Sequence, residues 1–366
     1  MTDIRLTSRI ENTARVIQIR GMFDIKASKT ETVVIKDNLP NLDERSWNIG
    51  LIVGASGTGK STIAKERFKE CFDPQVSWNE HSLIDNFDKK QHLKDIVNIL
   101  TAVGLSSPPT WLRPFDSLST GEKFRATTAR LLLDYPQLVA VDEFTSVVDR
   151  TVAQVASCAI AKTVRKRQQR FVAVSCHYDI IEWLQPDWLY EPHSGHFEWR
   201  SLRQRPPIHA RIISVDTQAW QLFARHHYLD STLHQAARCF VTLIENIPAV
   251  FIAVLPLPHP KLTNAYRVSR IVTMPDFQGI GIGTQVLTTI AAAYRAHQKH
   301  LYITTSHPAL MRSLNSNREW QMTRKPSRVT AIGKTSTIRY KPESANRITA
   351  SFRYIGQSNQ HAAALL

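Results

Sequence analysis

The sequence predicts an α/β protein of two domains, and three observations support this. The chain has 366 residues, which is long for one domain. Up to about residue 200, short apolar runs alternate with helical patterns, as in a mostly parallel sheet covered by helices. After the linker-like segment 203–207 (RQRPP), two adjacent apolar runs indicate an antiparallel hairpin instead. We expect domains at 1–200 and 211–356, a linker at 201–210 and a tail at 357–366.

The first domain is expected to begin with two short strands over 14–19 and 32–35. A third apolar run at 51–53 is read as a buried strand, because a glycine-rich turn and a helical pattern follow it. The remaining elements are expected as helices over 82–104, 119–133 and 151–167, with strands over 138–141 and 171–174.

The second domain is expected to contain a hairpin, because the apolar runs 239–245 and 249–255 flank a turn at Asn246 and Ile247. This pattern of strands followed by helices is typical of an α+β domain. The other elements are expected as helices over 216–228, 281–297 and 308–314, with strands over 267–274, 301–305 and 347–355.

The segment 54–61 (GASGTGKS) has the P-loop spacing G-x-x-x-x-G-K-[ST] between a strand and a helix. Its glycines let backbone N–H groups close around phosphates at a helix N-terminus. Lys60 is placed to reach the β- and γ-phosphates, and the Ser61 hydroxyl to ligate Mg²⁺. The residues expected to bind ATP here are Gly54, Gly57, Gly59, Lys60, Ser61 and Thr62.

Two carboxylates and a histidine follow later strands of the same domain. Asp142 and Glu143 end the apolar run 138–141, where Asp142 is expected to hold Mg²⁺ through water. Glu143 is expected to orient or deprotonate the water that attacks the γ-phosphate. His177 follows the strand near 171–175, at a position from which an imidazole reaches a γ-phosphate.

The segment 118–122 (LSTGE) at a helix start completes a set that resembles ABC-type ATPases over residues 12–195. The family pattern is a P-loop, an LSGGQ-like signature, a Walker B strand with its glutamate, a D-loop (here 146–149) and a histidine (here His177). The resemblance implies an ATP-dependent homodimer, in which Ser119 and Gly121 of one subunit contact the γ-phosphate held by the other. Ser119 and Glu122 also have the spacing of a helix capping box.

Some positions depart from the family pattern. Phe144 follows the catalytic glutamate where the family usually has proline or a small residue. The Q-loop glutamine is expected at Gln75 rather than Gln91, and Phe23 is the candidate for stacking on adenine. The region between P-loop and signature is short, so the sequence gives no support for coupling to a membrane domain.

The segment 278–283 (QGIGIG) follows a strand and opens a helix, so its backbone N–H groups are expected to face a pyrophosphate. A Rossmann motif fits poorly, since the third glycine and the later acidic residue are missing. The segment and its setting instead resemble GNAT acyltransferases over residues 210–356. The resemblance implies that acetyl-CoA or a related acyl-CoA is bound by Gln278, Gly279, Gly281 and Gly283, with the backbone of 271–274 along the pantetheine arm.

Acyl transfer needs a base for the acceptor and an acid for the leaving thiolate. The carboxylate usual on the central GNAT strands is missing, and the segment 267–270 (RVSR) is basic instead. We expect His227 and Tyr228 to do this work, because histidine accepts a proton near neutral pH and tyrosine can donate one. The alternatives are His226, Asp276, Ser306 and His307.

Charge is concentrated in the C-terminal part, where residues 211–366 contain 18 lysines and arginines against six acidic residues. A basic domain favours a polyanionic partner, and we expect nucleic acid, DNA rather than RNA. The four cysteines lack metal-site spacing, and no apolar run or N-terminal segment indicates a membrane span or signal peptide. These features predict a cytoplasmic protein without a membrane partner.

The whole chain resembles proteins that fuse an ABC-type ATPase to a GNAT-like domain, and its GNAT part is weakly similar to the phage Mom proteins, which modify adenine in DNA. The first hypothesis is therefore an ATPase that modifies a base amine of DNA with an acyl-CoA-type donor. A second is acylation of RNA or of a protein lysine. A third is a DNA-binding ATPase whose GNAT domain is only a binding module.

Overall fold

The computed structural model describes residues 2–201, 204–227, 232–258, 262–328 and 347–366. The chain forms two compact units, and each is made of several segments. The first comprises Met1–Ser77, Leu131–Asp149 and Ala161–Arg205, and the second Trp78–Arg130, Arg150–Ile160 and Pro206–Leu366. The second unit therefore joins the signature segment to the C-terminal fold. Within the described ranges, no helix is both long and apolar enough to cross a membrane.

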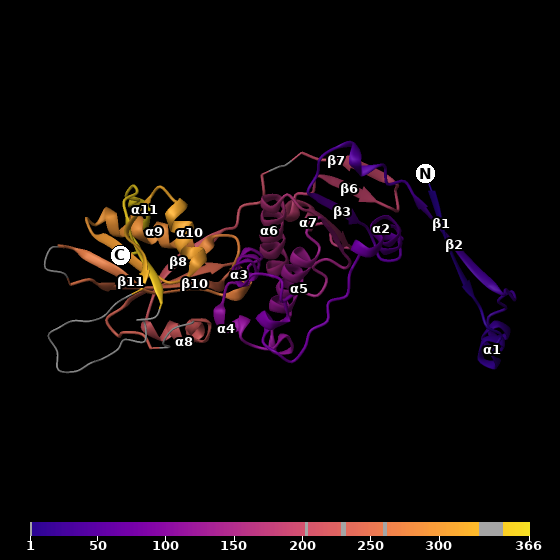
Figure 1. Ribbon diagram of the computed structural model, residues 1–366, viewed down its shortest axis with the longest axis horizontal. Helices are drawn as coiled ribbons and strands as arrows, with labels where there is room; N and C mark the ends of the chain where they lie inside the picture. Colours follow the sequence, from indigo (N-terminus) through magenta and orange to yellow (C-terminus); the bar gives the residue numbers. More distant parts are fainter. Residues whose placement is uncertain (1, 202–203, 228–231, 259–261, 329–346) are drawn as a thin grey trace. The chain divides into compact units, whose positions relative to one another are not determined.

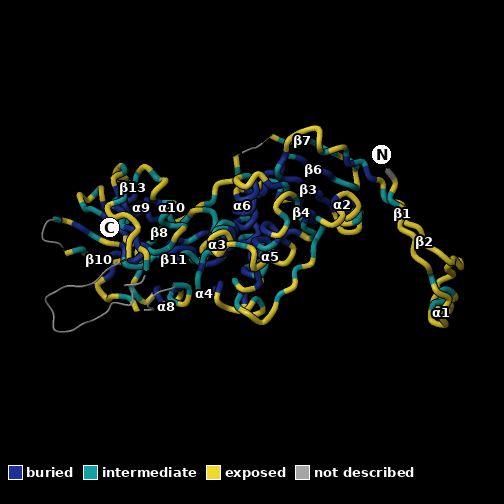
Figure 2. The backbone as a smooth tube through the Cα atoms, viewed as in Figure 1, coloured by how far each residue is buried: buried dark blue, intermediate teal, exposed yellow. Residues whose placement is uncertain are grey.

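A five-stranded sheet forms the core of the first unit, in the order β4-β5-β3-β6-β7. Only β7 runs antiparallel to its neighbour. Its strands are β3 (Ile49–Val53), β4 (Leu138–Val141), β5 (Arg170–Ser175), β6 (Trp188–Glu191) and β7 (His196–Trp199). Every residue of β3 is buried, which explains why it reads as a continuous apolar run (Figure 2).

Around this sheet, helices alternate along the chain with the parallel strands, as the sequence pattern predicts. They are α2 (Lys60–Phe68), α7 (Ile180–Leu184), and the later turns of α5 (Thr120–Asp134) and α6 (Arg150–Arg167), with short 3-10 turns at Leu42–Glu44 and Lys69–Cys71. Ile63 and Ala64 of α2 are fully buried and belong to the same apolar cluster as Ile52 of β3. This packing fixes the helix directly after the P-loop.

Gly50 lies at the centre of β3, where a side chain has no room. A Cβ atom added there would lie 1.9 Å from Cζ2 of the fully buried Trp188. We expect Gly50→Ala to lower the free energy of unfolding by about 1–3 kcal/mol, because the indole must shift in a packed core. Denaturant unfolding followed by circular dichroism measures this.

Gly21 provides the control, since it lies inside a helix and a Cβ added there meets no heavy atom within 4 Å. Gly21→Ala should leave stability unchanged or raise it by up to about 1 kcal/mol, because alanine favours helix over glycine. An equal loss of stability in the two variants would contradict the packing argument.

The N-terminal segment forms an antiparallel pair of β1 (Thr2–Arg9) and β2 (Thr30–Asp37), with α1 (Ala14–Met22) between them (Figure 1). The strand predicted over 32–35 lies within β2, but the strand predicted over 14–19 is wrong. That segment is helical because the Thr13 hydroxyl caps it, accepting from the Val16 N–H at 3.3 Å. Its backbone is thus paired within the helix, and none of the helix residues is buried.

A seven-stranded sheet forms the core of the second unit, in the order β13-β14-β12-β11-β10-β9-β8. Only β11 and β12 are parallel neighbours. The strands are β8 (Ala210–Val215), β9 (Arg238–Ile244), β10 (Ile247–Pro256), β11 (Ala265–Thr273), β12 (His300–Thr305), β13 (Trp320–Arg328) and β14 (Ile348–Tyr354). The predicted hairpin is confirmed, and Glu245 and Asn246 form its two-residue turn with φ of 49° and 65°.

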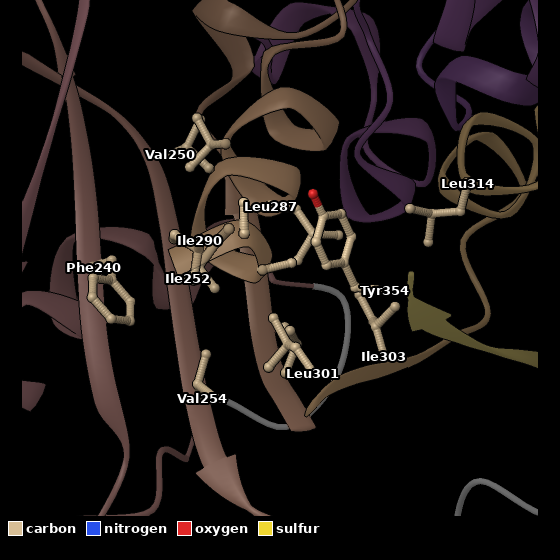
Figure 3. Packing of buried hydrophobic residues seen from close by; sticks show 14 of the residues in the cluster. Phe240, Val250, Ile252, Val254, Leu287, Ile290, Leu301, Ile303, Leu314 and Tyr354 are labelled. Carbon is tan, nitrogen blue, oxygen red and sulfur yellow. The ribbon is translucent and has the colours of Figure 1, made fainter. Parts of the chain in front are cut away.

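Helix α9 (Ile282–Ala296) packs across this sheet. Its Leu287 and Ile290 point into a cluster with Ile252 of β10 and Ile303 of β12 (Figure 3). The other helices of the unit are α3 (Leu93–Ala102), α4 (Pro108–Trp111), α8 (Trp220–Phe223), α10 (Pro308–Ser316) and α11 (Gln360–Ala363), besides the first turns of α5 and α6.

Two predicted helices are shorter than expected. The segment 216–227 contains only α8 between 3-10 turns, because Trp220 and Phe223 anchor it on Phe251 of β10. The segment 82–104 is split into a 3-10 turn and α3, since the Asn86 side chain bonds the backbone of Asn79 and Ser82. Side-chain bonds of this kind compete with helix formation.

Candidate functional site

The predicted P-loop lies between β3 and α2. Gly57 and Gly59 have φ of 79° and 86°, a backbone region that favours glycine. The Lys60 ammonium donates to the Ala55 carbonyl at 2.7 Å, so it lies over the loop. Such a loop at a helix start is suited to hold phosphates, and Lys60 to neutralise them.

Ser61 and Thr62 occupy the first turn of α2, and Ser61 is exposed. Gly54 opens the loop, and its N–H donates to the Ser175 carbonyl at 3.3 Å. The residues thus fit the phosphates of a nucleoside triphosphate, and the Ser61 hydroxyl is available to ligate Mg²⁺. Among the described residues no group of three or more metal-binding side chains is found, and Mg²⁺ in such sites takes few protein ligands beside phosphates and water.

Asp142 and Glu143 follow β4 in a tight turn. Glu143 has φ of 44°, and its N–H donates to the Asp142 carboxylate at 2.9 Å. Asp73 joins them, because its N–H donates to the Ala140 carbonyl at 2.7 Å. Burial raises the pKa of the Asp73 carboxyl, and the charges of Asp142 and Glu143 raise it further. A divalent cation would offset this concentration of negative charge.

Sequence reasoning missed Asp73, although its neighbour Gln75 was the candidate for the Q-loop. The Gln75 amide donates to the Asp73 carbonyl at 3.2 Å, so the two residues belong to one turn.

Phe144 is buried with its ring centre 5.5 Å from that of Phe171. The departure from the family pattern at Phe144 is thus accommodated in the core behind the carboxylates.

His177 follows β5 and is held by a hydrogen-bond chain to the turn of the carboxylates. Its N–H donates to the Ser175 hydroxyl at 3.2 Å, and that hydroxyl donates to the Phe144 carbonyl at 3.1 Å. The Phe144 N–H donates to the Val174 carbonyl at 2.8 Å. Glu143 and His177 are therefore positioned by the same pair of strands.

The signature segment forms the predicted capping box at the start of α5. The Ser119 N–H donates to the Glu122 carboxylate at 3.0 Å, and the Glu122 N–H donates to the Ser119 hydroxyl at 3.3 Å. The Glu122 carboxylate is buried and also accepts from Thr110 and Arg113. Ser119 itself is exposed, as contact with a second subunit requires.

In the loop before α9, two of the residues predicted to bind the acyl donor, Gln278 and Gly279, pack against other parts of the second unit. The Gln278 side chain is buried: its oxygen accepts from the Ser106 N–H at 2.7 Å, and its amide donates to the Thr273 carbonyl at 2.8 Å. A Cβ atom added to Gly279 would lie 2.8 Å from Cα of Gly104. Gln278 and Gly279 thus pack against Ser106 and Gly104, in the segment Trp78–Arg130 that also contains the signature. Their contact with a pyrophosphate stays a prediction.

Gly281 and Gly283 lie at the start of α9. Gly281 has φ of 87° and caps the helix, and a Cβ atom added there would have no heavy atom within 4 Å. A Cβ atom added to Gly283 would lie 2.7 Å from the Thr273 hydroxyl oxygen. The helix start is therefore open at Gly281, where an anionic group can approach the backbone.

Strands β11 and β12 separate after a short parallel pairing, which ends at Val268 and Ile303. On the other side of β11, Val268 pairs with Val254 and Arg270 with Ala253, so Ser269 is a bulge residue. Bulges of this kind interrupt pairing and re-aim a strand next to active sites. The bulge at Ser269 thus directly follows the last pair between the two strands.

A cavity of about 540 Å³ lies at this separation of β11 and β12. The polar side chains of its lining include Arg267, Ser269, Arg270, His234, Tyr302 and Thr304. Arg267 is exposed, whereas the Arg270 guanidinium donates to the carbonyls of Ser269 and Thr232. The described lining residues include no carboxylate, so the cavity is suited to an anionic ligand.

The predicted catalytic pair is only partly described, because Tyr228 lies outside the described residues. The His227 ring lies edge-on to Trp220, with centres 5.4 Å apart, and His227 does not line the cavity. Burial lowers the pKa of His307, whose Nε2 lies 2.8 Å from the Ser106 carbonyl oxygen. His234 and Tyr302 do line the cavity; sequence reasoning missed both, and no motif marks them.

The model of the acetyltransferase (GNAT) family matches residues 178–315, which include β11, the loop 278–283 and α9. The chain carries a GNAT domain. The predicted GNAT resemblance is thereby confirmed, whereas no curated protein matches the chain, so the similarity to Mom proteins stays a prediction.

The solved structures with similarity to this chain include ATP-binding cassettes. The protein cbiO1 from Clostridium perfringens, part of an ABC transporter complex, has a TM-score of 0.35 at 18% identity over 46% of this chain and 79% of its own. The cassette MJ1267 in its ADP conformation has a TM-score of 0.32 at 17% identity, over 54% and 90% of the two chains. The dimeric cassette MJ0796 with ADP and phosphate has a TM-score of 0.35 at 15% identity, over 48% of this chain and 91% of its own.

These similarities are low, so the ATPase fold rests on the chain's own geometry. The P-loop follows β3, the two carboxylates follow β4 and the histidine follows β5, and these three strands are neighbours in the order β4-β5-β3. With the GNAT match, this arrangement confirms the predicted fold class: an ABC-type P-loop ATPase domain followed by a GNAT-like α+β domain.

Proposed function

We propose that the chain is an ABC-type ATPase whose GNAT domain transfers an acyl group from an acyl-CoA to an amine of nucleic acid, DNA rather than RNA. The observation that carries this proposal is the cationic cavity where β11 and β12 separate. A helix start suits the phosphates of the donor, and a cavity lined by arginines suits a phosphate-bearing acceptor.

In the proposed transfer, the acceptor amine attacks the thioester carbonyl, loses a proton to a base, and the coenzyme leaves as a thiolate that takes up a proton. The backbone N–H groups at the Ser269 bulge are candidates to stabilise the oxyanion. His227 and Tyr228 remain the proposed base and acid. His234 and Tyr302 are further candidates, because they line the cavity.

For the ATPase, we infer a homodimer that closes on ATP and Mg²⁺. Ser61 and Asp142 would hold the metal, Glu143 would activate water, and His177 would contact the γ-phosphate. Ser119 and Gly121 would complete the site of the partner subunit. The exposed Ser119 at a capped helix start supports this arrangement.

The acceptor class is inferred from charge. Besides the arginines of the cavity, the edge strand β13 presents Arg324, Lys325 and Arg328, all exposed. Phosphate contacts of this kind bind nucleic acid without reading its sequence. A base amine inside a duplex must first be flipped out, at a cost of a few kcal/mol, and an ATP-closed dimer is suited to stabilise the opened state.

The affinity for DNA is expected to fall steeply with salt, by about 0.9 in log K per phosphate contact for each log unit of salt. Replacing Arg324, Lys325 and Arg328 together by alanine should reduce this slope by roughly two to three. Filter binding of duplex and single-stranded DNA over a salt series measures it. The control replaces Lys26, Lys29 and Lys36, which are also exposed but belong to the first unit, and should keep the slope.

A flat salt response, or no DNA binding at low salt, would favour acylation of a protein lysine instead. Equal competition by RNA of the same length would remove the preference for DNA. Mass spectrometry of nucleosides from cells expressing the chain then identifies the modified base, and an unchanged nucleoside profile would count against the transfer itself.

A further inference from the structure

A buried arginine joins the signature helix to the acyl-donor loop inside the second unit. Arg125 of α5 is fully buried. Its guanidinium donates to the carbonyl of Pro275 and, at 2.7 Å, to the carbonyl of Asp276. These carbonyls lie just before Gln278, so a charged side chain fixes the backbone that leads into the loop.

Ser106, on the segment between α3 and α4, forms a second link. Its N–H and hydroxyl donate to the Gln278 side-chain oxygen at 2.7 and 2.6 Å. Its carbonyl oxygen lies 2.8 Å from Nε2 of His307, which follows β12. The neighbouring backbones of Gly104 and Gly279 pack so closely that neither has room for a side chain.

The Arg125 link begins close to the signature. Gly121 lies one turn before Arg125 on α5, and a Cβ atom added to Gly121 would lie 3.3 Å from the Asp276 carboxylate. The exposed Ser119 caps the same turn. A contact between the signature and a nucleotide therefore acts on the turn of helix that also holds the donor loop.

We propose that Arg125 and Ser106 are positioning residues that couple the acyl-donor loop to the nucleotide state of the ATPase. This inference rests on the proposed function. A shift of α5 without the loop would break the bonds of the buried Arg125 guanidinium to the carbonyls of Pro275 and Asp276, which is costly because a buried charge loses hydrogen bonds. The loop therefore moves with the helix, and ATP closure changes the affinity for the acyl donor. By linkage, the donor changes the affinity for ATP by the same factor.

The test measures acetyl-CoA binding to the full chain by calorimetry, in a Glu143→Gln background with and without ATP. The expected ratio of the two dissociation constants is on the order of 5- to 150-fold. Ser106→Ala removes one of its two hydrogen bonds to Gln278, and Arg125→Lys cannot reach both carbonyls. Each should bring the ratio toward one and leave ATP affinity in the absence of acetyl-CoA unchanged.

Thr289→Ala is the matched control, because it also removes a hydroxyl hydrogen bond, at a half-buried position of α9 with its partner Gln285 on the same helix. It should keep the full ratio. If both ligands bind the Glu143→Gln reference protein with a ratio of one, or if Ser106→Ala and Arg125→Lys keep the full ratio, the coupling is overturned. Failure of either ligand to bind at all would reject the proposed function, and the coupling with it. Should Arg125→Lys fail to fold, Ser106→Ala decides alone.

Discussion

Purified Glu143→Gln protein is expected to bind ATP normally and to hydrolyse it at least about 100-fold more slowly than wild type, the scale of general-base catalysis. Glutamine has the shape of glutamate but cannot accept the proton of the attacking water. The left-handed backbone at this position, with φ of 44°, is no harder for glutamine than for glutamate. Phosphate release under single-turnover conditions measures the chemical step directly.

The same variant should accumulate as a nucleotide-bound dimer, visible by size-exclusion chromatography with light scattering, because the closed state no longer decays. Glu182→Gln is the control: it removes an exposed carboxylate on α7, outside the predicted site, and should leave hydrolysis unchanged. Unchanged turnover in Glu143→Gln would reject the assigned role, and a slow but monomeric variant would reject the dimeric site.

Gly281→Asp is expected to weaken acetyl-CoA binding by at least about tenfold. No heavy atom lies within 4 Å of an added Cβ, so the new side chain meets no steric conflict and points into the open helix start. There its charge repels the phosphates of the donor, and two unit charges ~5 Å apart near a protein surface interact by about 3 kcal/mol. Calorimetry with acetyl-CoA measures the change.

Gly281→Asn separates charge from backbone strain. Asparagine and aspartate have similar size, and both tolerate the left-handed conformation that φ of 87° requires better than other side chains. Asparagine should therefore retain most of the affinity that aspartate loses. Equal losses in both variants would assign the effect to strain, and no loss in either would place the phosphates elsewhere.

Motifs that depend on local backbone geometry could be predicted from the sequence. The P-loop, the carboxylates after β4, the capping box at Ser119 and the loop before α9 are short segments whose spacing alone limits their conformation. Continuous apolar runs also identified the buried strands, because β3 is covered on both faces.

Elements without a buried face were harder to predict. The sequence predicts a strand over 14–19, but the Thr13 cap and the absence of a partner strand among the described residues make α1 a helix. A continuous helix is predicted over 216–228, but the structure has only the short α8 there. The anchoring of Trp220 and Phe223 on Phe251 limits it, and such a contact cannot be read from periodicity. The first case is decided by a local cap, and in the second a tertiary contact outweighs local preference.

By itself, the sequence determined which residues can bind phosphates and activate water, since those roles follow from residue type and short spacing. Only the tertiary structure decided what surrounds them. Ser106 and Gln278 are 172 positions apart, and Arg125 and Pro275 are 150 apart. Their hydrogen bonds, and the cavity where β11 and β12 separate, arise from chain packing, and packing between distant segments leaves no periodic signal in a single sequence.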